Sequence, residues 1–220
     1  MNLHVILHFM ERSQPRPSGD LTELIFGYGL ILLALWMPDF PQLTLAPIAI
    51  GATLAIVLAS RHSLDELGLG ARGLTPSLWI LPAALAFAAL SIFVADKAGT
   101  LHSLYQGDPL HIGGYVVWTL YQQFLLNDYF MPRLTRLLNN EAAAITVSAL
   151  LFAAAHLPNV PLAAGTLLWG FVSCALFRRY RNLYALGLAQ GLLGLCFAIC
   201  IPDAVHHHLR VGLGYLTYHS

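Results

Sequence analysis

The chain has 220 residues, of which 57% are hydrophobic and only 10% are charged. Soluble domains carry about 25% charged residues, so this composition excludes an ordinary water-soluble globule and a disordered chain. The 11 basic residues balance the 11 acidic ones, which leaves no positive field for nucleic acid. The sequence therefore predicts an integral membrane protein in contact with lipids.

Seven apolar stretches are long enough to cross a bilayer, which takes about 20 residues as a helix. Each stretch is continuous rather than alternating, and this favours helices over a β-barrel. The expected fold is all-α, a polytopic membrane helix bundle of about seven transmembrane helices. The expected spans are residues 21–38, 42–60, 77–95, 110–131, 141–157, 162–177 and 183–201.

The basic residues predict an orientation for these spans. With seven crossings, nine arginines fall on one side and only Lys97 and Arg210 on the other. Basic loops stay in the cytoplasm, so the N-terminus is predicted to be cytoplasmic. The expected parts are an interfacial segment (1–20, with His4 and His8), the bundle (21–201) and a C-terminal tail (202–220).

Polar side chains inside membrane spans are costly, which makes them the first candidates for a functional site. Three spans carry them. Gln122, Gln123 and Asn127 lie in the fourth span, His156 ends the fifth, and Gln190 lies in the seventh. Packing of these three helices would let the five side chains converge. The alternative is that the amides only join helices to one another by hydrogen bonds.

Several other residues leave two interpretations open. Asp128 is either a catalytic acid or an anchor paired with nearby arginines. His156 is either a base or metal ligand, or a packing residue. The run from His206 to His208 is either a weak metal site or a polar interfacial turn, and the three cysteines are expected to pack between helices.

The polar segments together resemble the CPBP intramembrane proteases, the family of CAAX prenyl proteases and bacteriocin-processing proteins. The family pattern is Glu-Glu-x-x-x-Arg, then Phe-x-x-x-His, then His-x-x-x-Asn in a later span. Here the three parts are Gln122-Gln123-Phe-Leu-Leu-Asn127, then Phe152-Ala-Ala-Ala-His156 followed by Leu-Pro-Asn159, then Gln190-Gly-Leu-Leu-Gly194. The resemblance covers about residues 110–200 and implies a CAAX-protease-like core there.

The resemblance also implies what has changed. The two glutamates that would activate water are Gln122 and Gln123, the arginine is Asn127, and the later histidine is Gln190. An amide accepts no proton near neutral pH, so glutamate-based hydrolysis should be lost. One remaining histidine is too few ligands for zinc, and no metal or cofactor is expected.

Two functions follow, and a third is residual proteolysis. The first is binding of a hydrophobic or lipidated peptide without standard proteolysis. The second is altered chemistry on a prenyl or lipid substrate, with His156 as acid or base and the amides as orienting groups. Phe152, Asn159 and Asp128 are the expected substrate-binding residues. The family implies a bacterial inner membrane as the location.

Overall fold

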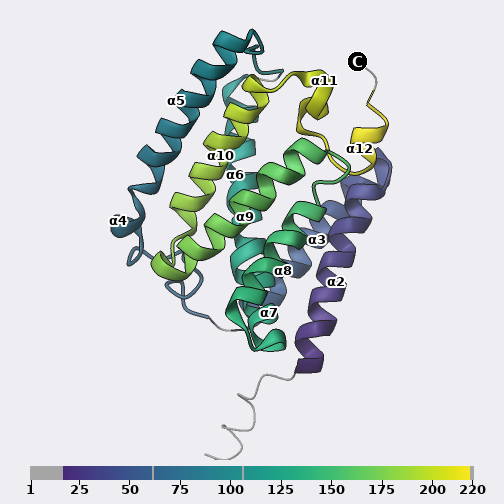
Figure 1. The fold of residues 1–220 in the computed structure, drawn as a ribbon. Coiled ribbons are helices and arrows are strands. Elements are labelled where there is room, and N and C mark those ends of the chain that lie inside the picture. The colour runs from purple at the N-terminus through teal and green to yellow at the C-terminus, as the bar shows by residue number, and fades with distance from the viewer. Residues whose placement is uncertain (1–16, 61, 106, 219–220) are drawn as a thin grey trace, which may run out of the picture.

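The computed structural model describes residues 17–60, 62–105 and 107–218, and within these ranges it contains helices and no strands (Figure 1). The interfacial helix predicted around His4 and His8 lies outside the described residues. The helices are α2 (Pro17–Trp36), α3 (Asp39–Ala59), α4 (Leu74–Ser77), α5 (Ile80–Ala98), α6 (Pro109–Phe124), the π-helical segment η1 (Leu125–Phe130), α7 (Met131–Leu138), α8 (Glu141–Ala154), α9 (Val160–Tyr180), α10 (Leu183–Cys200), α11 (Asp203–His206), the 3₁₀ turn η2 (His207–Leu209) and α12 (Leu213–Leu216).

The helical composition confirms the predicted fold class. Five helical stretches of the described chain are long and apolar enough to cross a membrane: α2, α3, α4 with α5, α9 and α10. Their outer faces expose large apolar side chains, such as Phe40 at 82% and Leu168 at 70%, as expected of surfaces that meet lipid. The chain is an integral membrane protein. Seven crossings stay a prediction, because α6 carries polar residues and α8 has only 14.

The helices form one bundle in which α2 and α3 lie side by side at one edge and α5 lies at the other (Figure 1). Helix α10 packs against both α5 and α6, and α8 packs against α9. Helix α6 therefore lies between the two edges, where its polar residues are covered by neighbouring helices rather than by lipid.

One end of the bundle gathers most of the basic side chains. Arg133 and Arg136 of α7 pair with Glu23 and Asp20 of α2, at 2.8 and 2.6 Å. At the same end, Arg178 of α9 pairs with an acidic side chain at the start of α8. We call this the arginine-rich end. The clustering agrees with the predicted charge asymmetry, while the side of the membrane that this end faces stays a prediction.

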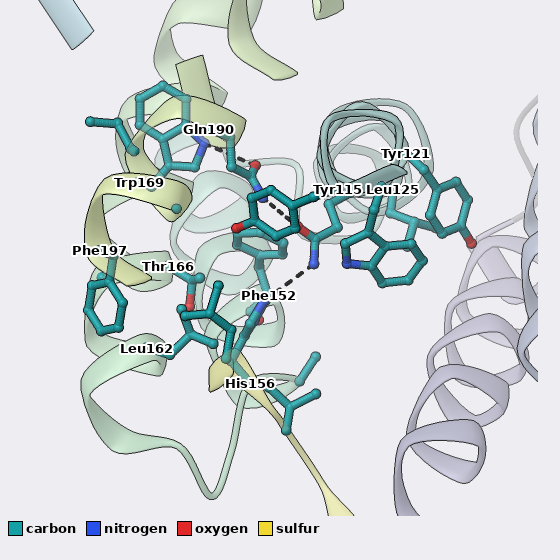
Figure 2. Close-up of a pocket in the computed structure, with 18 of the residues that line it drawn as sticks. Tyr115, Tyr121, Leu125, Phe152, His156, Leu162, Thr166, Trp169, Gln190 and Phe197 are labelled. Carbon is teal, nitrogen blue, oxygen red and sulfur yellow. Dashed lines mark hydrogen bonds between the residues drawn. The ribbon is translucent and has the colours of Figure 1, made fainter. Parts of the chain in front are cut away.

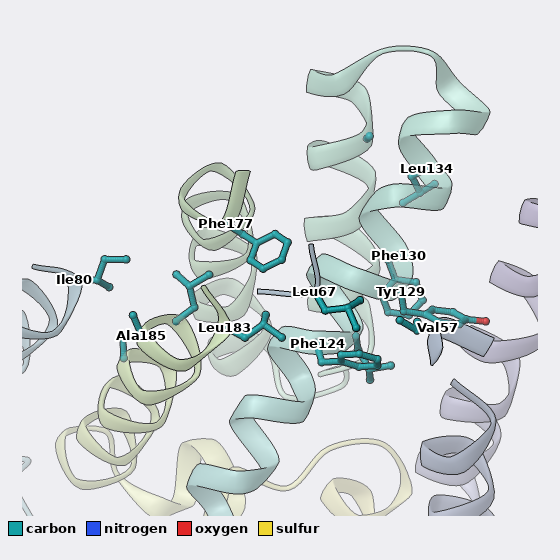
Figure 3. Close-up of a cluster of buried hydrophobic side chains, with 14 of the residues drawn as sticks. Val57, Leu67, Ile80, Phe124, Tyr129, Phe130, Leu134, Phe177, Leu183 and Ala185 are labelled. Atoms are coloured by element: carbon teal, nitrogen blue, oxygen red, sulfur yellow. The ribbon is translucent and has the colours of Figure 1, made fainter. Parts of the chain in front are cut away.

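The hydrophobic core is centred on the π-helical segment η1, whose six residues are all buried. Tyr129 of this segment is fully buried, and its hydroxyl donates a hydrogen bond to the backbone carbonyl of Glu23. Figure 3 shows Tyr129 and Phe130 close to Val57 of α3. These contacts fix η1 between α2 and α3, and thereby fix the direction in which α6 presents its polar side chains.

Candidate functional site

Helix α6 supplies the amides of Gln122 and Gln123, and η1, which continues it, supplies that of Asn127. The local sequence of α6 explains its start and its end. Asp108 caps the helix by accepting hydrogen bonds from two backbone N–H groups of the first turn, and Pro109 occupies the position where a missing N–H costs nothing. The helix then changes to π geometry at Leu125. A π turn adds one residue and redirects the side chains that follow, and such turns are frequent at functional sites.

The amide of Asn127 lies within this π turn and points back along the helix. Its Nδ2 donates to the side-chain oxygen of Gln123 at 2.9 Å and to the backbone carbonyl of the same residue at 3.2 Å. Gln123 is fully buried, and its own Nε2 donates to Oε1 of Gln190 on α10 at 2.5 Å. These amides thus join α6 and η1 to α10.

Gln190 occupies the centre of the hydrogen-bond network. Its Oε1 accepts from Gln123 and also from the indole N–H of Trp169 on α9, at 3.1 Å. Its Nε2 donates to Oε1 of Gln122 at 2.5 Å. Figure 2 shows this group above His156, with dashed lines running from Gln190 towards the imidazole. Three helices therefore meet at one side chain.

His156 lies in the turn that follows α8, and its hydrogen bonds fix where its proton is. Nδ1 lies 2.7 Å from the backbone carbonyl of Phe152, and because a carbonyl only accepts, Nδ1 must carry the hydrogen. In the neutral ring, Nε2 is then an acceptor. The Nε2 of Gln122 lies 3.5 Å from it and can donate. The imidazole is held with its lone pair towards the amides.

The resulting hydrogen-bond network has a single direction. Each member donates to the next, in the order Asn127, Gln123, Gln190, Gln122 and His156. Every link joins an amide N–H to an acceptor, so the network contains no charge and no acidic proton. One acceptor at its start, Oδ1 of Asn127, is buried without a partner among the described residues.

The meeting of α6 and α8 follows from the chain between them. Gln122 and His156 lie at nearly equal distances along the chain from the turn between α7 and α8. Helix α8 packs antiparallel to α7, and both rise about 1.5 Å per residue, so the two residues reach the same level of the bundle. Helix α8 ends at Ala154, three residues before the predicted end of the fifth span, which frees His156 to turn inward.

A cavity of about 880 Å³ opens beside this network and is lined almost entirely by apolar side chains. Gln122, Gln190 and His156 line it, whereas Gln123 and Asn127 lie behind them. None of the described residues that line it is Asp, Glu, Lys or Arg. The cavity is therefore an uncharged chamber whose wall carries one imidazole, two amides of the network and the separate amide of Gln42.

The three residues predicted to bind substrate lie in different places. Phe152 lines the cavity and meets the His156 ring edge to face, with centroids 4.9 Å apart. Asp128 is buried in η1 and does not line the cavity. Asn159 is fully buried, caps α9 and donates hydrogen bonds to the C-terminal segment instead.

Residues 108–196 match a family model described as type II CAAX prenyl endopeptidase Rce1-like. The match starts at the cap of α6 and ends within α10, so it includes the whole network and His156. This part of the chain is similar to the type II CAAX prenyl endopeptidases. No curated protein and no solved structure matches the chain. This similarity and the five apolar helices agree in giving an integral membrane protein with a region similar to an intramembrane endopeptidase.

Two residues of the site escaped the sequence prediction. Trp169 was not among the predicted site residues, yet it donates to Gln190. Its place in the middle of an apolar span was a signal, because a buried indole N–H needs an acceptor. Tyr115 of α6 lines the cavity, and Gly194 leaves room for it, since a Cβ there would overlap the Tyr115 hydroxyl. No feature of the sequence indicated that contact.

Proposed function

We propose that this protein binds the hydrophobic chain of a lipidated peptide in the cavity without hydrolysing it by the glutamate mechanism. The observation that carries the proposal is a cavity of about 880 Å³ with no carboxylate on its wall. This volume lies within the range of about 300–1,000 Å³ typical of ligand pockets. The apolar lining suits a prenyl or acyl chain, and the polar wall suits the peptide or thioether part next to it.

The amides cannot do what carboxylates do at the same places. In the family pattern that the sequence resembles, glutamates stand at the positions of Gln122 and Gln123. A glutamine side chain neither takes a proton from water near neutral pH nor carries the negative charge that a metal or an imidazolium needs. Gln123 also lies behind the cavity wall and is committed to Asn127 and Gln190. Its contribution is to hold Gln190 in place.

A second candidate function rests on the orientation of His156. Its Nδ1–H bond to the carbonyl of Phe152 leaves Nε2 as the free base, and the residue lines the cavity. This is the arrangement that a general base requires, with Gln122 and Gln190 orienting a prenyl or lipid substrate. Turnover in this case would depend on His156 and would not need a carboxylate.

Binding is tested with a dansylated, S-farnesylated tetrapeptide and the purified chain in detergent. We expect a saturable fluorescence change and no cleavage product by mass spectrometry. Gly165→Leu should weaken binding at least tenfold, because Gly165 lines the cavity with open space beside it. The matched control is Gly113→Leu, a helical glycine that also faces open space but does not line the cavity, and it should bind normally.

Chemistry is tested with the same peptide. If the wild-type chain cleaves it and His156→Ala abolishes cleavage, the binding proposal is overturned in favour of an active enzyme. If only Gln122→Glu with Gln123→Glu cleaves it, the amides are what prevents hydrolysis and the proposal stands. Equal binding by the Gly165→Leu variant and the wild type would show that the cavity is not where the peptide binds.

A further inference from the structure

The C-terminal segment does not trail away from the bundle but folds back over the cavity. We call residues 201–212 the strap. Ile201, Leu209 and Val211 of the strap line the cavity. The N–H of Gly212 donates to the carbonyl of Leu157 at 2.9 Å, one residue after His156. The strap thus closes the cavity at the end of the bundle opposite the arginine-rich end.

One side chain holds the strap next to the polar site. Nδ2 of Asn159 donates to the backbone carbonyls of His206 at 2.9 Å and Arg210 at 3.0 Å. Its Oδ1 accepts from the N–H of Leu162 and caps α9. Asn159 is fully buried and lies three residues from His156. A single amide therefore couples the strap to the start of α9.

A second set of contacts, a cluster of imidazoles around one carboxylate, also stabilises the strap. Oδ1 of Asp203 lies 3.3 Å from Nε2 of His206, and Oδ2 lies 3.1 Å from Nε2 of His208. His102, from the connection between α5 and α6, donates from Nε2 to the carbonyl of Ile201 at 2.8 Å. We call these four residues, His102, Asp203, His206 and His208, the clasp.

The clasp has the spacing of a metal site, but its ring nitrogens are used in hydrogen bonds. Ligand atoms of His102, Asp203 and His206 lie within 4.8 Å of one another. However, both ring nitrogens of His102 face carbonyl oxygens, of Ile201 and Ser103, and both donate to them when the ring is protonated. Nδ1 of His206 accepts from the N–H of Leu209, which leaves its hydrogen on Nε2. The clasp joins chain segments rather than presenting lone pairs to an ion.

The strap backbone is strained where the clasp holds it. His207, His208 and Leu209 have φ angles of 47°, 52° and 59°. Residues other than glycine rarely adopt this left-handed region, and three in succession are held there only by the contacts around them. Releasing those contacts would relieve the strain, which favours opening of the strap.

We propose that the strap is the aqueous gate of the cavity, closed by Asn159 and the clasp and opened with relief of its left-handed turn. The gate would admit the polar part of the ligand while the apolar chain enters from the lipid. This inference rests on the proposed function for the identity of the ligand. The opening itself is measurable without any ligand.

Three native cysteines report the opening. Cys196 and Cys200 line the cavity, whereas Cys174 is buried in the core beside Phe152 and does not line it. In lipid nanodiscs, a negatively charged methanethiosulfonate reagent reaches the first two only through an aqueous opening. Labelling of each cysteine is followed by mass spectrometry of its peptide. Unfolding would expose Cys174 as well.

We expect Asn159→Ala to raise the labelling rates of Cys200 and Cys196 about tenfold, because two hydrogen bonds to the strap are lost. Labelling of Cys174 should not change. The matched control is Asn182→Ala, since Asn182 is also buried and caps a helix, α10, but does not touch the strap. That variant should leave Cys200 labelling unchanged relative to Cys174.

The strain is tested by a pair of variants at one residue. His207→Ala and His207→Gly both lose the hydrogen bond to the carbonyl of Tyr215, but only glycine tolerates φ near 47° without cost. The glycine variant should therefore label Cys200 about fivefold more slowly than the alanine variant. Equal labelling rates for the two variants would show that backbone strain does not contribute to opening of the gate.

The gate is overturned if Asn159→Ala raises labelling of all three cysteines together or of none. Failure of the proposed function looks different. The farnesylated peptide would then neither bind nor slow labelling of Cys196, while the selective effect of Asn159→Ala would persist.

Discussion

The amide network and the clasp both hold segments together with buried polar groups, but they use opposite kinds of group. The network inside the bundle consists of four neutral amides and one neutral imidazole in a single donor-to-acceptor order. The clasp, at the end of the bundle, combines a carboxylate with three imidazoles, one of which faces backbone carbonyl oxygens with both ring nitrogens. Of these two regions, only the clasp contains a carboxylate.

The difference follows from the cost of burial. An ionised group placed among apolar helices costs far more than an amide, which needs only its hydrogen-bond partners. The network therefore fixes the positions of its side chains without using charge, but it cannot move protons between its amides. The clasp contains imidazoles, the side chain type whose charge can change between pH 5 and 8. We expect the network to resist pH change and the clasp to respond to it.

The largest predicted effect comes from removing the centre of the network. Gln190→Leu leaves the N–H groups of Gln123 and Trp169 and the Oε1 of Gln122 without their partner. Each unpaired buried group costs about 1–3 kcal/mol, so the loss in unfolding free energy should be at least about 3 kcal/mol. Thermal unfolding in detergent measures it. The control is Gln42→Leu, an amide on the cavity wall outside the network, which should change little.

A smaller effect is predicted where the cavity wall is tightest. A methyl group at Gly194 overlaps the Tyr115 hydroxyl, so Gly194→Ala should destabilise the fold by about 1–3 kcal/mol. Tyr115→Phe should restore part of that loss in the double variant, and the coupling energy from the double-mutant cycle measures the contact. Gly165→Ala faces open space and should be neutral or stabilising. If the effects of Gly194→Ala and Tyr115→Phe simply add in the double variant, the two residues are not in contact.

The sequence was sufficient to predict the fold class and which polar residues meet. Continuous apolar runs can only be helices in lipid, and the spacing of Gln123 and Asn127 places them on one face. The structure brings Gln122, Gln123, Asn127, Gln190 and His156 together, although their roles stay predictions. The fifth span was predicted to reach residue 157, whereas α8 ends at Ala154 and His156 lies in the turn that follows.

The strap could not be predicted, since its contacts are to backbone atoms. Asn159 was expected to bind substrate because it follows His156 in a family-like segment, but its amide donates to two strap carbonyls. The position of a backbone carbonyl cannot be read from residue types, because every residue has one. The histidine run was interpreted as either a metal site or a polar turn, and only the hydrogen bond from Leu209 to His206 shows which nitrogen holds the proton.

A modest effect is predicted at the edge of the network. Trp169→Phe removes one of the two donors to Oε1 of Gln190 and leaves that oxygen satisfied by Gln123. Because no buried group loses its last partner, the cost should be about 0.5–1.5 kcal/mol, well below that of Gln190→Leu. Thermal unfolding of the two variants in one detergent compares them directly. A loss as large as that of Gln190→Leu would mean that Trp169 supports the helices by packing.

The smallest predicted effect separates the clasp from the network by pH. Hydrogen bonds to the carbonyls of Ile201 and Ser103 raise the pKa of His102, so its contribution is complete at low pH and is lost as pH rises through that raised value. Burial lowers the pKa of His206, so its contribution is complete at high pH and is lost as pH falls through the lowered value. Asp203 and His208 face the same cluster.

These opposite trends predict that the strap is closed most firmly near the ordinary histidine pKa of about 6.5. Hydrogen–deuterium exchange of strap amides, corrected for the intrinsic pH dependence of exchange, should pass through a minimum there between pH 5 and 8. His102→Gln should remove the rise on the alkaline side and keep the one on the acid side. Amides of α6 around Gln122 should show neither, because the side chains that join α6 to α10 there are amides, which do not titrate. A matching minimum in α6 would mean that the two regions open as one.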